Sequence, residues 1–222
     1  MLLGIGILSG FVLIAATLFV NSSPEFGGKA TQEQKKFYSR SLNYKDGKFI
    51  NRGNVEMSMD FNKFFKSLVG YFSPTPQTKP SSDIPVHKID SLNIARYKGK
   101  TRMVWFGHST FLLQINGKNI LIDPMFGNVP APHPMLGGKR FSSELPIQIE
   151  KLPQIDAVIL SHDHYDHLDY GSIFKLKDKV NHFYTPLGVG VHLLEWGIPQ
   201  GQITELDWWQ QSTFGDLVFK CT

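Results

Sequence analysis

The first long pattern in the chain is an apolar run, LLGIGILSGFVLIAATLFV, which fills residues 2–20 without a charged side chain. As a helix, these residues rise about 28 Å, close to the hydrocarbon thickness of a bilayer. A cleaved signal peptide is the rival interpretation, but no Lys or Arg precedes the run, which also exceeds the usual apolar region of about 7–15 residues. A helix that is apolar on every face is also unsuited to a core position at a terminus. We therefore expect a single-pass transmembrane anchor over residues 1–20.

Residues 21–98 have the pattern of a linker and an N-terminal arm. Thr31 and Gln34 have the spacing of a capping box, which predicts a short helix over TQEQKKFYSR. A second helix is predicted over about residues 60–72, with Asp60 as its N-cap and five apolar side chains on one face: Phe61, Phe64, Phe65, Leu68 and Phe72. Such a stripe indicates a surface that packs on the following domain or lies in a membrane interface. The Pro- and Ser-rich segment SPTPQTKPSSDIP then predicts an irregular arm.

From Arg102 onward the pattern changes to short strands with tight turns. RMVWFG, TFLLQI and NILID alternate with turns, and NGK at Asn116–Lys118 predicts a hairpin because Asn and Gly tolerate positive φ. A long Pro- and Gly-rich loop, PMFGNVPAPHPMLGGKRFSSELP, follows. Long loops often form a wall of a functional site. IDAVIL is a fully apolar strand of the buried kind; HFYTP, QITEL and the terminal TFGDLVFKCT are further predicted strands, and GVGVHLLEWG is a short predicted helix. The pattern predicts an α/β domain over residues 99–222.

Composition and charge narrow the function classes. The 222 residues are 41% hydrophobic and 19% charged, an ordinary balance for one sizeable globular domain. The net charge is +4 without a run of like charges, so nucleic-acid binding is not indicated. Basic residues after the apolar run indicate attraction to anionic lipid and a cytoplasmic C-terminal domain: Lys29, Lys35, Lys36 and Arg40. The single cysteine, Cys221, excludes an intrachain disulfide and a Cys-rich zinc site.

The densest group of ionisable side chains, SHDHYDHLD at residues 161–169, directly follows the apolar strand AVIL. Four of its members form the pattern H-x-H-x-D-H: His162, His164, Asp166 and His167. If the strand ends near Ser161, these side chains lie on the turn before the next helix and can converge on one point. Imidazole suits Zn(II), Fe(II) or Mn(II), and a carboxylate adds an oxygen ligand. The alternative is a solvated polar loop. Because four possible ligands follow a buried strand so closely, the pattern instead predicts a metal site. Two ions about 3.5–4 Å apart can divide these ligands.

Five further residues are candidates for the site. His108 follows a strand and can reach a cleft as a catalytic residue, although a lone histidine in a turn is more often structural. Asp123 ends a strand and is a candidate to hold the tautomer of a ligand histidine. Asp163 is a candidate for the same role, or is simply exposed. Lys139 and Arg140, in GGKR, are candidates to meet a phosphate, although adjacent basic residues on a loop are usually solvated.

These motifs together resemble a known family. SHDHYDHLD, with GHSTFLL and ILIDP upstream, resembles the metallo-β-lactamase-fold hydrolases. WFGHSTFLLQINGKNILIDPMF, GGKRF and LPQIDAVILSHDHYDHLD are similar to the branch that contains N-acylphosphatidylethanolamine-hydrolysing phospholipase D and its bacterial relatives. The resemblance runs from about residue 85 to the end. It implies an αββα sandwich with a dinuclear metal centre, usually zinc, at one edge of the sheets.

The resemblance also implies a role for each motif residue. His162 and His164 would bind the first metal, and Asp166 and His167 the second, with Asp166 also orienting a bridging hydroxide. Metal binding lowers the pKa of water towards about 7, which makes such a hydroxide a nucleophile at neutral pH. In the phospholipase branch the bond cut is a phosphodiester, which leaves phosphatidic acid and an N-acylethanolamine.

Three later ligands are implied by the resemblance: a histidine, a bridging aspartate and a final histidine. Downstream of His167 the histidines are His182 and His192, which lie in apolar patterns that indicate structural roles. We therefore expect residues 99–222 to be the first half of the αββα sandwich, truncated at its C-terminal end. The metal site would be incomplete, and the 222-residue chain inactive by itself.

The sequence therefore predicts a membrane-anchored, metal-dependent hydrolase of the phospholipase D type. Its expected substrate is N-acylphosphatidylethanolamine or a related lipid, and its expected cofactors are two divalent ions, zinc first, with iron or manganese as alternatives. A lactone or a small phosphorylated sugar is the alternative substrate on the same fold, and a non-catalytic remnant is the alternative of another class. The sequence does not determine the oligomeric state.

Overall fold

The fold divides into two compact units, which are described separately. The larger comprises Met1–Ala30, His87–Arg140 and Leu145–Thr222, and the smaller comprises Thr31–Val86 with Phe141–Glu144. The predicted division into residues 1–20, 21–98 and 99–222 stays a prediction. The computed structural model describes residues 2–51, 53, 60–73, 79–135 and 137–222, without the side chains of residues 2–9, 71 and 72.

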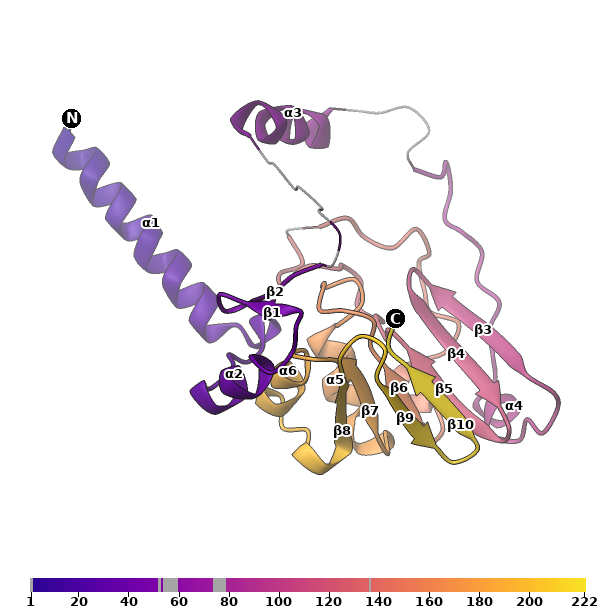
Figure 1. The fold of residues 1–222 in the computed structure, drawn as a ribbon. Coiled ribbons are helices and arrows are strands. Elements are labelled where there is room, and N and C mark those ends of the chain that lie inside the picture. Colours follow the sequence, from indigo (N-terminus) through magenta and orange to yellow (C-terminus); the bar gives the residue numbers. More distant parts are fainter. Residues whose placement is uncertain (1, 52, 54–59, 74–78, 136) are drawn as a thin grey trace. The chain divides into compact units, whose positions relative to one another are not determined.

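The larger unit is built on a mixed sheet of six strands in the order β3-β4-β5-β6-β7-β8 (Figure 1). The first three strands pair antiparallel, and β5 to β8 pair parallel. This arrangement confirms the predicted α/β class. The strands are β3 (Arg102–Gly107), β4 (Thr110–Ile115), β5 (Lys118–Ile122), β6 (Ala157–Ile159), β7 (Phe183–Pro186) and β8 (Ile203–Leu206).

Successive side chains of the central strands point to opposite faces of this sheet. On one face, Leu121 and Val158 are buried in the main core with residues of α5 (Tyr170–Leu176) and α6 (Gly190–Glu195). This core also includes residues from the short α4 (Ser91–Ala95). The helices therefore cover one face of the sheet.

The other face of the sheet is covered by the C-terminal hairpin, β9 (Gln211–Phe214) and β10 (Leu217–Lys220). Ile120 and Ala157 are buried there, with partly buried side chains of the hairpin against them. The sequence predicts a single terminal strand over TFGDLVFKCT, and this prediction is corrected. Gly215 adopts φ 62° at the turn, a conformation that glycine reaches without steric cost, so the alternating segment folds back on itself.

The turn between β4 and β5 has the predicted hairpin geometry. Asn116 and Gly117 have φ values of 51° and 72°. Two consecutive positive φ values match the twist of the flanking strands, which is why Asn-Gly is favoured there. The strand pairing runs from Ile115–Lys118 at the turn to Phe111–Ile122. The Asn-Gly dipeptide thus fixes the register that leads β5 towards Asp123.

The N-terminal run forms helix α1 (Leu2–Ser22), followed by a short 3-10 turn, η1 (Pro24–Phe26). Among the described residues, no helix combines the length and the apolar character needed to cross a bilayer. The predicted transmembrane anchor over residues 1–20 is therefore not supported.

The smaller unit begins with the predicted capping box. The backbone N–H of Gln34 donates to the Thr31 hydroxyl, and the Thr31 N–H donates to Gln34 Oε1, at 3.2 and 2.8 Å. These bonds open helix α2 (Gln32–Tyr38), which is followed by two short paired strands, β1 (Tyr44–Lys45) and β2 (Lys48–Phe49). The helix prediction for this segment is confirmed.

Helix α3 (Phe61–Phe72) also follows the prediction. The Asp60 carboxylate caps it by accepting a hydrogen bond from the Lys63 N–H at 2.8 Å. Four members of the apolar stripe are exposed: Phe61, Phe64, Phe65 and Leu68. The side chain of Phe72 and residues 74–78 of the predicted irregular arm lie outside the described residues.

Candidate metal centre

The metal motif lies on the turn between the buried strand β6 and helix α5, as the sequence predicts. The backbone N–H groups of His167 and Leu168 both donate to the His164 carbonyl, at 2.9 and 2.8 Å. The Leu168 side chain is buried in the core, and Asp169 caps the following helix through the Ser172 N–H at 2.9 Å. The end of the turn that leads into α5 is therefore anchored in the fold.

The first candidate ligand group consists of His162, His164 and Asp166. The Nε2 atom of His162 lies 3.1 Å from Nδ1 of His164. With metal–ligand bonds of about 2.0–2.2 Å, two ligands of one ion lie roughly 3–3.5 Å apart. These two imidazoles already have the separation that a shared ion requires.

The second candidate group consists of His108, Asp166 and His167. Asp166 Oδ2 lies 2.8 Å from Nε2 of His108 and 3.6 Å from Nε2 of His167. In each group, the ligand atoms lie within 4.8 Å of one another. Asp166 belongs to both groups, so its carboxylate lies between the two places where an ion could bind, and the donor set of imidazoles and one carboxylate fits Zn, Fe or Mn.

Asp123 contacts the motif from the end of β5, where it is buried and adopts φ 42°. Its carboxylate accepts hydrogen bonds from the Ser161 N–H and hydroxyl, both at 2.7 Å. The same carboxylate lies 2.9 Å from Nδ1 of His167. A proton held on Nδ1 leaves Nε2 unprotonated and directed at Asp166, the arrangement that a metal ligand needs. The contact matches the sequence hypothesis for Asp123, whose effect on metal binding stays a prediction.

The turn between β3 and β4 holds Asp166 from the other side. His108 adopts φ 47°, and Trp105 Nε1 donates to its carbonyl at 2.9 Å. Beside the bond between His108 and the Asp166 side chain, the Ser109 hydroxyl donates to the Asp166 backbone carbonyl at 2.6 Å. This turn therefore fixes both the main chain and the side chain of Asp166.

The electrostatic surroundings favour the protonation states that metal binding requires. Burial lowers the pKa of His162, and the neighbouring His167 and His164 lower it further. Burial alone would raise the pKa of Asp166, but the hydrogen bond with His108 and other contacts outweigh it, so the pKa is lowered. A neutral imidazole and an ionised carboxylate are the forms that bind metal ions.

Three residues that the sequence suggests for the site lie outside the two ligand groups. The Asp163 carboxylate faces His192, with Oδ2 3.8 Å from Nε2, and this contact lowers the pKa of Asp163. The Arg140 guanidinium donates to the backbone carbonyls of Gly127 and Phe106, at 3.0 and 3.4 Å, and burial lowers its pKa. Its donors are thus engaged in holding loops together. Lys139 is exposed.

Two serines of the site were missed from the sequence. Ser161 links Asp123 to the first ligand group, because its hydroxyl also lies 2.9 Å from Nδ1 of His162. Ser109 anchors the Asp166 main chain. Each is adjacent in sequence to a candidate histidine, which is the signal that could have found them. His192 was assigned a structural role, and its contact with Asp163 could not be read from its helical pattern.

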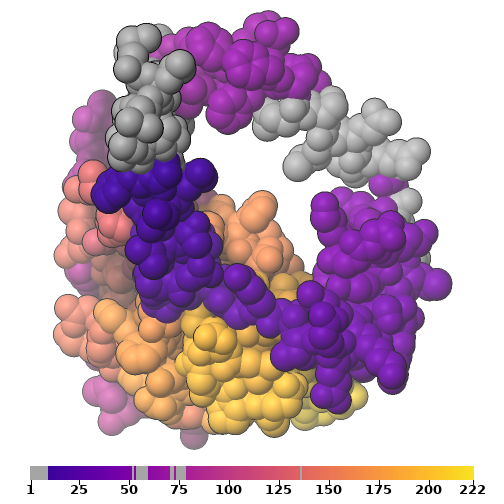
Figure 2. All heavy atoms as spheres, turned by 90° about the vertical axis from the view of Figure 1, so that its left-hand side faces the viewer, coloured from indigo at the N-terminus to yellow at the C-terminus, as the bar shows by residue number. Residues whose placement is uncertain are grey.

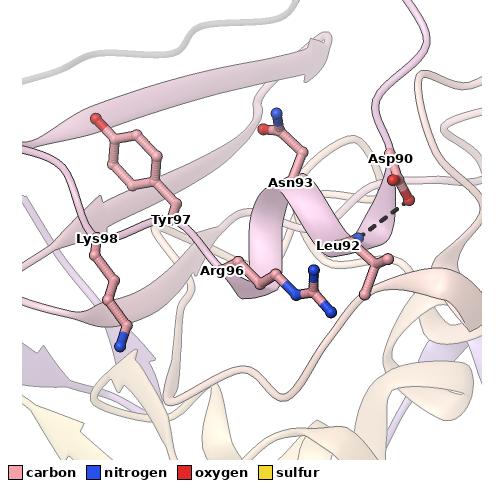
Figure 3. A pocket seen from close by; sticks show the side chains of 6 residues that line it. All are labelled: Asp90, Leu92, Asn93, Arg96, Tyr97 and Lys98. Atoms are coloured by element: carbon pink, nitrogen blue, oxygen red, sulfur yellow. Dashed lines mark hydrogen bonds between the residues drawn. The ribbon is translucent and has the colours of Figure 1, made fainter.

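A separate hollow of about 490 Å³ lies around α4, and Figure 3 shows its lining side chains. Asp90 caps this helix through the Leu92 N–H at 3.1 Å. Arg96 and Lys98 are also at its rim, but none of the candidate metal ligands lines it. The candidate metal site is therefore separate from this hollow.

Comparison with known proteins gives a family match for part of the chain. Residues 118–222 match the family described as "Beta-lactamase superfamily domain". The family match supports a metallo-β-lactamase fold for this part of the chain. The match includes Asp123 and the whole motif turn, and it begins after His108.

Three relatives extend the comparison. An uncharacterized protein of Mycobacterium tuberculosis is 38% identical over 185 residues, which are 82% of this chain and 49% of the relative. N-acyl-phosphatidylethanolamine-hydrolyzing phospholipase D 1 of Caenorhabditis elegans is 30% identical, over 64% of this chain and 40% of that protein. A metal-dependent hydrolase of Anaeromyxobacter sp. is 34% identical, over 47% of this chain and 34% of that protein. The chain thus spans about half the length, or less, of the relatives it matches.

Proposed function

We propose that this protein is a phospholipase D-type hydrolase that cleaves the phosphodiester of N-acylphosphatidylethanolamine or a related lipid. The observation that carries the proposal is the pair of ligand groups that share Asp166 at the end of a buried strand. The lipid substrate is supported by the name of the nematode relative and by the motifs around the turn. The coarser class, a metal-dependent hydrolase, is the one that the family itself provides.

In this proposal two divalent ions bind at the turn, with zinc as the first candidate and iron or manganese as alternatives. His162 and His164 would hold one ion, and Asp166 and His167 the other. Such ions, when bound, supply Lewis acidity at the reacting phosphoryl group. The protein's contribution is to hold these four side chains in place and in the correct protonation states.

Asp166 is the proposed catalytic residue because it lies between the two ligand groups. Its ionised carboxylate can accept a hydrogen bond from an attacking water and so orient that water. His108 is proposed as the residue that positions Asp166 through the 2.8 Å hydrogen bond. Asp123 is proposed to act one step further back, by holding His167.

Metal binding is the first test, because it can be measured without turnover. Equilibrium dialysis followed by elemental analysis should find bound zinc, iron or manganese. His164→Ala should weaken binding at least about tenfold, because removing a ligand costs more than removing one of its supports. His87→Ala, at an exposed histidine of the same unit, is the matched control and should bind like the wild type. Absence of bound metal in the wild type would overturn the proposal.

Substrate choice is the second test. The metal-loaded protein is assayed with N-acylphosphatidylethanolamine, an N-acyl-homoserine lactone and a small phosphorylated sugar. Release of an N-acylethanolamine from the lipid supports the proposed substrate. Hydrolysis of only the lactone or only the sugar phosphate would favour the alternative substrates.

A further inference from the structure

A smaller pocket lies directly beside the metal motif, within the larger unit. Its volume is about 260 Å³, and His164 forms part of its wall. This volume corresponds to roughly nine water-sized groups of about 30 Å³ each. Four of its lining side chains are aromatic or aliphatic: Phe26, Tyr165, Leu168 and Trp196. We call this the aromatic pocket.

One wall of the aromatic pocket comes from the N-terminal segment, residues 24–28, which lies outside the family match. The Phe26 ring meets the Tyr165 ring edge-on, with centroids 6.3 Å apart. Trp196 Nε1 donates a hydrogen bond to the Pro24 carbonyl at 2.8 Å, which joins residues 172 positions apart in sequence. Figure 2 shows the indigo N-terminal segment lying against the orange and yellow surface of later residues.

Two glycines allow this segment to approach α6 closely. Gly27 has φ 64°, and a Cβ placed on it would lie 2.0 Å from His192 Nδ1. A Cβ on Gly28 would lie 2.4 Å from the Val191 carbonyl oxygen. Both distances are far below contact, so only glycine fits at either position without movement. The wall is thus closely fitted to the domain.

The charges around the aromatic pocket disfavour an anion. Its lining includes the carboxylates of Glu25 and Asp163 and contains no Lys or Arg. A negative group entering the pocket would be repelled by these two carboxylates.

A cation would be attracted by these carboxylates and rings, but metal ions bound beside His164 would repel it. An uncharged group avoids both penalties. Its apolar part can contact the rings of Phe26 and Trp196, and an N–H or O–H on it can donate to a carboxylate.

We propose that the aromatic pocket binds an uncharged, apolar substituent of the substrate, with residues 24–28 as part of the binding site. The inference rests on the proposed function in one respect, because it takes the molecule that binds in the pocket to be the substrate of the hydrolase. Binding in the pocket does not require turnover, so it can be measured by itself.

The test uses three probes with the same eight-carbon chain and different charge: octanamide, octanoate and octylammonium. Their dissociation constants are measured by titration calorimetry on the 222-residue chain, first without metal and then loaded with zinc. Octanamide should bind most tightly in the zinc-loaded protein. Tightest binding of octylammonium would make the pocket a cation site, and tightest binding of octanoate an anion site; either result overturns the proposal.

Two variants test the wall. Phe26→Ala removes a ring from the pocket, and Gly28→Ala forces the segment away from Val191. Each should weaken octanamide binding about tenfold, the effect expected from losing a buried ring contact. Phe61→Ala and Gly10→Ala are the matched controls, since Phe61 is exposed on α3 and a Cβ on Gly10 would meet nothing within 4 Å. Unchanged octanamide binding in both pocket variants, with thermal unfolding like the wild type, would overturn the proposal.

Failure of the pocket and failure of the proposed function give different results. His162 is a candidate ligand that does not line the pocket, so His162→Ala should lose metal and still bind octanamide in metal-free buffer. A wild-type chain that binds octanamide but no metal would overturn the proposed function alone. A chain that binds metal but shows no octanamide binding would overturn the pocket alone.

Discussion

The motif turn carries a dense group of ionisable side chains, and helix α3 carries a stripe of aromatic ones. The two groups differ in the contacts that their side chains make. On the motif turn, His167 and Asp166 are held by residues from other turns. Asp123 contacts His167 across 44 residues of sequence, and His108 contacts Asp166 across 58. On helix α3, the Phe61 and Phe64 rings are 78% and 53% exposed. The cap of α3 is local, because Asp60 binds the N–H three residues ahead.

This difference shows how a sequence pattern can have two kinds of consequence. The stripe on α3 follows from helical periodicity and a cap, which need only neighbouring residues. The motif turn works as a site only because two other turns supply partners for its side chains. Substitutions around the motif turn should therefore have large effects, and substitutions on the exposed face of α3 should have small ones.

The largest loss of stability is expected from a core substitution in the sheet that supports the motif turn. Phe106 is 2% exposed and lies in the main core, at the end of β3 before the His108 turn. Phe106→Ala should lower the free energy of unfolding by about 3–5 kcal/mol, through lost burial and the cavity left behind. Urea denaturation measures the change. Met103→Ala, on the same strand but 64% exposed, is the control, and an equal loss in both variants would contradict the prediction.

Next in size is the support that Asp123 gives to His167. Asp123→Asn keeps the shape of the side chain but removes the negative charge that lies 2.9 Å from Nδ1 of His167. Metal affinity should fall about 10- to 100-fold, the usual effect of losing a partner behind a metal ligand. Competition with a chromophoric chelator measures it. Asp178→Asn, at an exposed carboxylate, should change nothing, and equal affinities for Asp123→Asn and wild type would argue against this support.

A smaller effect is expected from Glu205, which anchors the start of α6. Burial raises the pKa of its carboxyl, and the N–H groups of Gly190 and Gly188, which donate to it at 2.9 and 2.8 Å, only partly offset this. The folded state therefore binds the proton more tightly than the unfolded state. Stability from this group is present at low pH and is lost as pH rises above the ordinary value near 4.5, towards the raised folded pKa.

Glu205→Gln cannot ionise and should remove this pH-dependent loss. Thermal unfolding of wild type and variant between pH 4 and about pH 7 measures the difference. The melting temperature of the wild type should fall relative to that of the variant as the pH rises. A constant difference between the two across the range would show that Glu205 does not titrate in this way.

The smallest expected effect is on α3. Phe61→Ala should change the free energy of unfolding by no more than about 0.5 kcal/mol, because an exposed side chain loses little burial. Urea denaturation in the same buffer as for Phe106→Ala makes the two values directly comparable. A loss of several kcal/mol would show that the stripe is buried in solution, and the contrast between the two regions would then disappear.

The sequence by itself determined the elements that depend on nearby residues. The capping box of α2, the cap and stripe of α3, the Asn116–Gly117 hairpin and the buried strand before the motif were all read correctly, because each is specified by contacts within a few residues. The position of the motif on a turn between strand and helix followed for the same reason.

Only the tertiary structure decided which distant residues meet. It turned Arg140 towards backbone carbonyls, and it brought His108 and Ser109 to Asp166. It also placed residues 24–28 against His192, far along the chain. The pairing and order of strands fix these meetings, and no local pattern encodes the distance between residues that lie tens or hundreds of positions apart.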